Sequence, residues 1–91
     1  MTTAVVLIES DRDSMSTLGG ALADLEGVAE AYSVTGEWDF VAILHVKEHA
    51  DLAPIVTSHI GMLEGVRRTQ TMVAFEAFSK HDLEAMFSIG G

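Results

Sequence analysis

The tetrapeptide Leu25-Glu26-Gly27-Val28 recurs thirty-eight positions later as Leu63-Glu64-Gly65-Val66. The same offset aligns an earlier apolar run, Ala4-Val5-Val6, with Ala42-Ile43-Leu44. A match that stays in register over half the chain indicates two similar halves. We therefore interpret the fold as one strand–helix–strand unit that occurs twice.

The first half contains the signals of two strands and one helix. The apolar, β-branched run Thr3–Glu9 is typical of a strand, and Val28–Thr35 predicts another. Asp13 or Ser14 is the expected N-cap of the intervening helix, and Gly27 is placed to end it with a positive φ. The apolar residues between them recur at helical spacing and predict one buried stripe: Met15, Leu18, Leu22 and Leu25.

The second half repeats this order. Asp39–Val46 predicts a strand, Asp51 an N-cap, and Gly65 the end of a second helix. Val66–Phe78 predicts a long last strand, and Lys80–Ser88 a short terminal helix. The buried face of the second helix is expected to carry Leu52, Val56, Ile60 (or His59) and Leu63.

The two halves meet at Gly36-Glu37-Trp38, a short glycine-containing connection that predicts a hairpin. The resulting order, β-α-β-β-α-β, is the ferredoxin-like arrangement of the α+β class, with both helices on one face of a four-stranded antiparallel sheet. Alternation along the strands makes both sheet faces apolar, and two helices cover only one. We expect the second face to pack on another copy, which gives a homodimer of the dimeric α+β barrel kind. Residues 1–80 form this domain, and 81–91 a tail or short helix.

Composition excludes several classes of function. The 91 residues suffice for one domain. Five Lys and Arg stand against fourteen Asp and Glu, for a formal net charge of −9. That charge disfavours direct nucleic-acid binding and docking on an anionic membrane. The chain has no Cys, which excludes disulfides, thiolate metal sites and a cysteine nucleophile. Met1-Thr2-Thr3 lacks the basic segment of a signal peptide, so we expect no signal peptide and a cytoplasmic protein.

Catalysis has little support in the sequence. The four histidines are scattered, no nucleophile elbow is present, and we expect no metal, no cofactor and no enzymatic activity. The alternative is a small dimeric α+β barrel enzyme of the monooxygenase kind. For that alternative His59 is the only candidate reactive group, and a buried His59 facing an enclosed cavity would favour it.

The hairpin is the stretch most informative about function. Trp38 offers a large contact surface for a subunit or ligand. Gly36 allows close approach to the backbone, and Asp39 can accept hydrogen bonds from an ammonium group. Thr69 and Thr71 add hydroxyl groups on a nearby strand or at a subunit contact. Together these groups are suited to hold a small zwitterion between subunits.

Two segments carry a family resemblance. Val34-Thr35-Gly36-Glu37-Trp38-Asp39-Phe40 resembles the Val-x-Gly-acid-aromatic-Asp-aromatic hairpin of the Lrp/AsnC effector-binding domain, also called the RAM domain. Leu63-Glu64-Gly65-Val66-Arg67-Arg68-Thr69-Gln70-Thr71 is similar to that domain's Leu-x-Gly-Val-x-x-Thr-x-Thr segment, and Val73–Lys80 to its final strand and tail. The likeness covers about Ala4 to Lys80. Trp38 stands where Tyr or Phe is more usual.

The resemblance implies a ferredoxin-like domain that dimerises through its sheet, in dimers that assemble into octameric or decameric rings. Small effectors, usually amino acids, bind between dimers near the hairpin. By motif position the implied ligand-binding residues are Gly36, Trp38, Asp39, Thr69 and Thr71, with Gln70 and Glu37 as further candidates.

Full-length members of that family carry a helix-turn-helix DNA-binding domain before this one. Here the first predicted strand begins within a few residues of Met1. We therefore expect a stand-alone RAM-domain protein that takes part in regulating amino-acid metabolism. Co-assembly with full-length Lrp/AsnC regulators is an alternative role.

Overall fold

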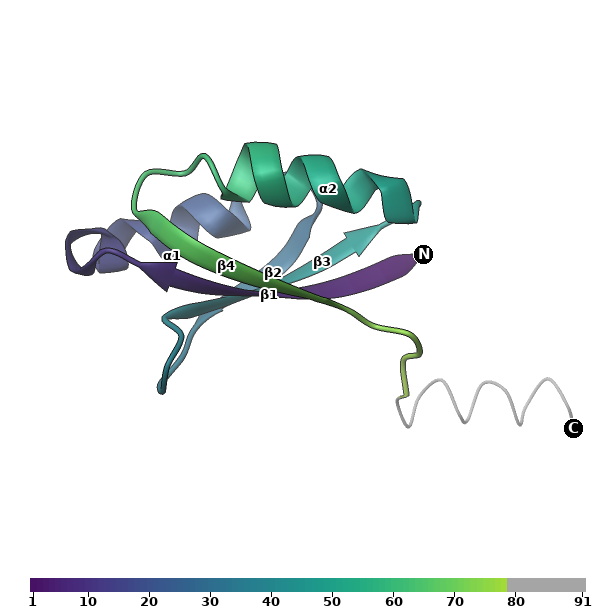
Figure 1. Ribbon diagram of the computed structural model, residues 1–91, viewed down its shortest axis with the longest axis horizontal. Coiled ribbons are helices and arrows are strands. Elements are labelled where there is room, and N and C mark those ends of the chain that lie inside the picture. The colour runs from purple at the N-terminus through teal and green to yellow at the C-terminus, as the bar shows by residue number, and fades with distance from the viewer. Residues whose placement is uncertain (79–91) are drawn as a thin grey trace, which may run out of the picture.

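The computed structural model describes residues 1–78 as an antiparallel sheet with its helices on one side (Figure 1). The predicted β-α-β-β-α-β order and ferredoxin-like fold are confirmed. The 81–91 tail and the terminal helix expected at Lys80–Ser88 lie outside the described residues. The elements are β1 (Thr2–Ser10), the 3₁₀ turn η1 (Arg12–Ser14), α1 (Met15–Ala23), β2 (Val28–Ser33), β3 (Phe40–Val46), the 3₁₀ turn η2 (His49–Asp51), α2 (Leu52–Pro54), the π-helix η3 (Ile55–Ile60) and β4 (Val66–Val73).

The strands lie in the order β2-β3-β1-β4, and each neighbouring pair is antiparallel. In the centre, Val6 of β1 pairs with Ala42 of β3 on one side and with Thr71 of β4 on the other. Each of the three pairings joins a strand of the first half to a strand of the second. The sheet is therefore built entirely from contacts between the halves.

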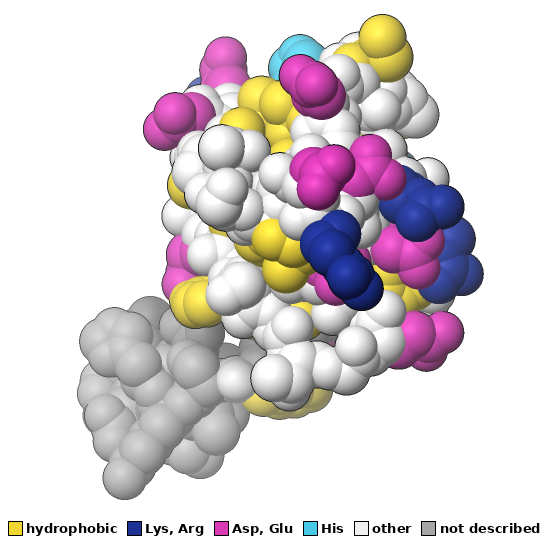
Figure 2. All heavy atoms as spheres, turned by 90° about the vertical axis from the view of Figure 1, so that its left-hand side faces the viewer, with side chains coloured by type: hydrophobic (Ala, Val, Ile, Leu, Met, Phe, Trp, Pro, Cys, Tyr) yellow, Lys and Arg dark blue, Asp and Glu magenta, His cyan; other side chains and the backbone are white. Residues whose placement is uncertain are grey.

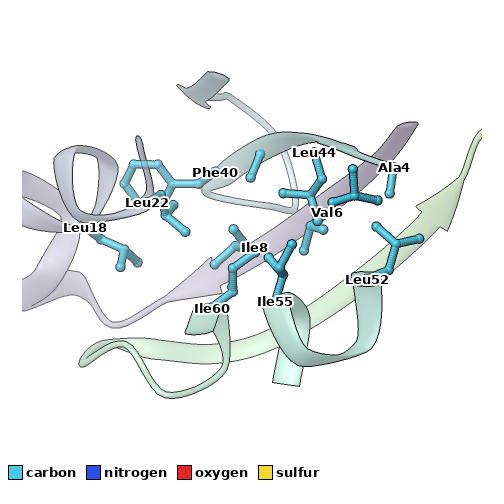
Figure 3. Packing of buried hydrophobic residues seen from close by; sticks show 12 residues of the cluster. Ala4, Val6, Ile8, Leu18, Leu22, Phe40, Leu44, Leu52, Ile55 and Ile60 are labelled. Carbon is cyan, nitrogen blue, oxygen red and sulfur yellow. The ribbon is translucent and has the colours of Figure 1, made fainter. Parts of the chain in front are cut away.

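The core lies between the sheet and the helices (Figure 3). Alternate residues of β1 and β3 point into it, as the predicted alternation requires. Of the predicted stripe on α1, Leu18 and Leu22 are buried, whereas Met15 is 39% exposed. The fully buried side chains with the largest volumes are Ile8, Leu18, Leu22, Leu44, Ile60 and Val6.

The second helix differs from the expected single α-helix. After one turn of α2 the chain widens into the π-helix η3, and Gly61 N donates to Val56 O at 2.8 Å, five residues back. Wider winding places residues five apart on one side, so Ile55 and Ile60 are both buried. Val56 is only partly buried, and His59 is exposed. The predicted stripe is confirmed, because Leu52 and Ile60 are buried and the partly buried Val56 and Leu63 pack against the core. The prediction missed Ile55, which the π-helical winding also buries.

The predicted N-cap residues lie at the predicted positions, but their side chains do not make the expected capping hydrogen bonds. Ser14 precedes α1 and Asp51 precedes α2, but neither side chain bonds to the helix that follows. Asp51 Oδ2 instead accepts from Glu48 N at 3.1 Å. The carboxylate thereby fixes the turn that enters α2.

The last strand is shorter than predicted. β4 ends at Val73, and beyond it Ala74 N donates to Thr3 O at 2.9 Å. Phe75 and Phe78 are 102% and 78% exposed. They lie within the predicted strand Val66–Phe78, but no neighbouring strand of residues 1–78 pairs with them.

The sheet face opposite the helices is apolar and uncovered by residues 1–78. The register of the strands places the same-face residues beside one another, for example Val5 between Ile43 and Met72. The other apolar members of this open face are Leu7, Tyr32 and Val41. No helix within residues 1–78 has the length and apolar character that a membrane span needs.

Candidate functional site

The β2–β3 hairpin curls away from the helices, toward the open face of the sheet (Figure 1). Val34 N donates to Asp39 O at 3.0 Å and closes the turn. Gly36 lies at the exposed tip with φ 104°, a conformation that favours glycine. A Cβ at this position would have nothing within 4 Å. The glycine is therefore explained by backbone conformation, and the tip is open to a neighbour or ligand.

Asp39 is held where the hairpin joins the end of β1. Its backbone N donates to Ile8 O at 2.9 Å, and its Oδ2 accepts from Ser10 N at 2.8 Å. Ser10 is buried and Asp39 is half-buried. Within residues 1–78 the structure pairs only Oδ2 of this carboxylate, so the carboxylate is oriented while retaining a second acceptor oxygen.

Trp38 is fixed by an arginine of β4. The guanidinium carbon of Arg68 lies 4.4 Å from the centroid of the indole ring. Arg68 also reaches Glu9 Oε2 of β1, at 3.4 Å. A guanidinium over an aromatic face is an attractive cation–π contact. The contact therefore connects the β2–β3 hairpin to the paired ends of β1 and β4.

Three of the chain's five Lys and Arg residues gather at this end: Arg12, Arg67 and Arg68. Arg67 Nε pairs with Asp11 Oδ1 at 3.4 Å across an exposed surface. Figure 2 views this end of the molecule and shows cationic side chains lying against acidic ones. A pocket of about 350 Å³ opens here, lined by Ser10, Arg12, Met15, Asp39 and Arg67.

Sequence reasoning missed Ser10, Arg12 and Arg67 as neighbours of Asp39. Ser10 ends β1, Arg12 lies in the turn η1 and Arg67 lies at the start of β4, so only the folded sheet brings them to the hairpin. The sequence offered one signal for the two arginines: the chain has only five Lys and Arg, and two of them are the adjacent pair Arg67-Arg68. Opposite charges on the walls of this pocket suit a zwitterion, with an anionic and a cationic group.

Among residues 1–78, the structure does not bring the five predicted ligand-binding residues together. Trp38 and Asp39 lie at the hairpin base, and Gly36 at its tip. Thr69 and Thr71 pair with Ile8 and Val6, so they share the sheet face that carries the helices. Neither threonine lines the Asp39 pocket.

The two further candidates also lie apart from Asp39. Gln70 pairs with Leu7 on the open face, and Glu37 is exposed at the turn.

Tyr32 and Glu30 lie two residues apart on the open face of β2. The phenol donates a hydrogen bond to Glu30 Oε2. That hydrogen bond, followed by repulsion between phenolate and carboxylate, raises the pKa of Tyr32 above its ordinary value of 10.0. The strand thus carries a protonated phenol beside a carboxylate.

His59, the candidate reactive group of the enzyme alternative, is exposed and lines an open pocket. Among residues 1–78, no three His, Asp or Glu side chains are close enough together to hold a metal ion. The buried histidine that would favour an enzyme is therefore not what the structure shows at this position.

Residues 3–83 match the family model of the Lrp/AsnC ligand binding domain. The chain belongs to this family. Over 77 residues it is 36% identical to an uncharacterised helix-turn-helix-type transcriptional regulator of Pyrococcus furiosus, a match that covers 81% of this chain and 51% of the relative. The chain thus spans about half the length of the curated relatives it matches.

Solved structures show the same Lrp/AsnC fold. A crystal structure of a Thermus thermophilus protein is 46% identical, with a TM-score of 0.82 over 88% of this chain and 100% of that one. A feast or famine regulatory protein of Mycobacterium tuberculosis, complexed with L-methionine, is 25% identical, with a TM-score of 0.74 over 88% of this chain and 54% of that one. The Lrp/AsnC resemblance expected from the hairpin and Leu-x-Gly-Val motifs is confirmed.

Proposed function

We propose that the chain is an Lrp/AsnC effector-binding protein that takes a free amino acid at the hairpin end of the sheet. The observation that carries this proposal is the oriented Asp39 carboxylate, fixed by Ser10 N at 2.8 Å beside two arginines. An α-ammonium group would bind Asp39, and an α-carboxylate would face Arg12 and Arg67. Membership in a ligand-binding family supports the same class of function.

The relative from M. tuberculosis supports an amino acid as the ligand, since that protein was solved with L-methionine. In this chain Gly36, Trp38, Thr69 and Thr71 do not line the Asp39 pocket. We propose that another subunit brings them to it: the exposed Gly36 tip supplies backbone, and the threonines supply hydroxyl groups. A site completed between subunits would link ligand binding to assembly, because ligand favours the assembly that presents the complete site.

The open face of the sheet supports the proposal that the chain forms a dimer, from which the site between subunits is then assembled. Val5, Leu7, Val41 and Ile43 form its centre, and Met72 extends it onto β4. A contiguous apolar surface of this kind marks an interface. We propose that two copies pack these faces together, and that dimers join into octameric or decameric rings through the hairpin ends.

Calorimetry with the twenty amino acids tests the proposed site. Asp39→Asn keeps an oxygen for Ser10 N and removes the charge, so it should weaken binding at least tenfold, which corresponds to about 1.4 kcal/mol. Asp24→Asn, an exposed acid at the end of α1, is the matched control and should bind as the native chain does. Failure of all twenty amino acids to bind, or equal binding by Asp39→Asn, would overturn the assignment. Light scattering with and without the best ligand measures the coupling to assembly.

A second proposal is co-assembly with full-length Lrp/AsnC regulators, and through them a part in regulating amino-acid metabolism. The supporting observation is that the curated matches are helix-turn-helix-type regulators of which this chain covers about half. Mixed assemblies would carry fewer DNA-binding domains than rings of the regulator alone. Co-purification of a tagged copy with a full-length regulator, with an open-face Leu7→Glu variant as the non-assembling control, tests this role.

A further inference from the structure

A second and larger pocket lies at the other end of the sheet from Asp39. The hairpin pocket adjoins Ser10 at the end of β1, whereas this one adjoins Val46, which pairs with Thr2 at the start of β1. Its volume is about 590 Å³, within the range of small-molecule sites. Its lining residues are Glu26, Gly27, His45, Val46, Lys47, Asp51, Ile55 and His59.

The floor of this pocket is apolar and tightly built. Val46 and Ile55 are each 8% exposed and belong to the core. Gly27, with φ 93°, packs so closely that a Cβ there would overlap Ile55 Cδ1. The Gly27 carbonyl accepts from His45 N at 3.1 Å, which ties the turn to the end of β3. The turn, the strand end and the helix thus form one fixed wall.

The helical wall is the unusual π-helix. Ile55 and His59 both come from η3, and the wide winding lets Ile55 stay buried while His59 lines the opening. π-Helical segments are rare and occur frequently at functional sites. The π-helical winding therefore shapes this wall of the pocket.

The polar lining is acidic on balance. Glu26 and Asp51 carry two negative charges against one positive charge on Lys47. Asp51 is held by Glu48 N at 3.1 Å, and His45 Nδ1 lies 3.0 Å from Thr3 Oγ1. Because residues 1–78 contain no cluster of three metal-type ligands, these groups do not make a metal site there. An organic ammonium needs only an acidic surround and hydrogen-bond acceptors.

We propose that this pocket binds a small organic cation: a primary amine with a short aliphatic chain. The ammonium group binds between Glu26 and Asp51, and the chain lies on Val46 and Ile55. The site is separate from the amino-acid site at Asp39 and does not depend on it.

Methyl NMR of the full chain tests the proposal, with the Ile55 δ1 methyl as reporter and n-butylamine as probe. We expect n-butylamine to shift this resonance, and n-butyrate and n-butanol at equal concentration to leave it in place. An equal response to n-butanol, or none to n-butylamine, would overturn the proposal. A resonance that follows protein concentration instead of amine would overturn it too, because another subunit would then fill the pocket.

A matched pair of variants sharpens the test. Glu26→Gln removes one exposed charge from the pocket and should weaken n-butylamine binding about threefold, as expected for a partly exposed ion pair. Glu64→Gln makes the same change at the equivalent turn of the second half and should leave the affinity unchanged. Equal effects of both variants would contradict a local site. Asp39→Asn should leave n-butylamine binding unchanged. A failure of the amino-acid proposal can therefore be distinguished from a failure of the amine proposal.

Discussion

The two helix-to-strand turns share one sequence and differ in what packs on them. Gly27 and Gly65 both have positive φ, at 93° and 96°. Gly27 packs against Ile55 of the π-helix and borders the larger pocket. Gly65 packs against Ser14, and its carbonyl accepts from Asp11 N at 2.8 Å. The repeated residues therefore set the backbone conformation of both turns. The residues that differ between the halves decide what surrounds each turn: a packed Ser14 at Gly65 and a pocket at Gly27.

The same division holds across the strands. Glu30 and Tyr32 of β2 correspond by the repeat offset to Arg68 and Gln70 of β4. On β2 the pair hydrogen-bonds within the strand, whereas Arg68 reaches across to Glu9 and Trp38. Equivalent positions of β2 and β4 thus carry different side chains that make different contacts. The two halves therefore share a backbone arrangement but not their side-chain interactions.

The largest loss of stability in this comparison is expected at the Gly65 turn, which packs against Ser14. In Gly65→Ala the new methyl would overlap Ser14 Cβ and Oγ, on a short side chain with little freedom to move. With the left-handed backbone added, we expect a loss of about 3 kcal/mol of unfolding free energy. Urea denaturation at fixed protein concentration measures it. Adding Ser14→Gly should recover about half of the loss, and no recovery would contradict the packing explanation.

Gly27→Ala should cost less, about 2 kcal/mol, because its neighbour is the flexible end of Ile55. Adding Ile55→Val removes that terminal methyl, so the double variant should lose less stability than the sum of the single losses. Gly36→Ala is the control for backbone strain alone, since nothing lies within 4 Å of its Cβ, and should lose about 1 kcal/mol. Strict additivity at Gly27 and Ile55 would refute the contact.

A smaller effect of opposite sign is expected in α1. Gly20 is exposed, with nothing within 4 Å of an added Cβ, so Gly20→Ala should stabilise the chain by about 0.7 kcal/mol. Gly19→Ala should gain less because Phe40 Cε1 lies 3.3 Å from its Cβ and must move. The offset counterparts in η3 are Thr57 and Ser58, which are not glycines. Thermal unfolding compares the two variants, and equal gains would show that Phe40 is not restrictive.

The smallest effect is spectroscopic. Glu30→Gln should lower the pKa of Tyr32 toward 10.0, because the carboxylate that holds the phenolic proton and repels the phenolate is gone. Ultraviolet titration of the single tyrosine measures it. Glu37→Gln, an exposed acid in the nearby turn, should leave the pKa unchanged. An unaltered titration in Glu30→Gln would place the cause elsewhere.

Most of the fold was predictable because its signals are local. Alternation in β1 and β3, the Leu18–Leu22 spacing and the turn glycines each report a backbone conformation within a few residues. The π-helix was not predictable from a stripe read with α-helical spacing. The end of β4 was also missed, since the apolar run beyond Val73 resembles a strand although no strand of residues 1–78 pairs with Phe75 or Phe78.

The candidate site was predictable only where residue type carried the information. Trp38 and Asp39 stood out because such side chains in a turn are suited to contacts. Arg12 and Ser10 could not be assigned, since nothing local connects them to a hairpin more than twenty residues away. The threonines were grouped with the hairpin by motif, and the register places them on the helix-covered face.

The strand order has a consequence for how the chain holds together. Within residues 1–78, no two strands of the same half pair with each other, because β1 lies between β3 and β4, and β2 lies against β3. A half cut out at the hairpin would therefore have two strands without a hydrogen-bonding partner. Two such halves could satisfy one another only by interleaving, as they do here. The single chain therefore holds together as two interleaved strand–helix–strand halves connected by the turn at Gly36.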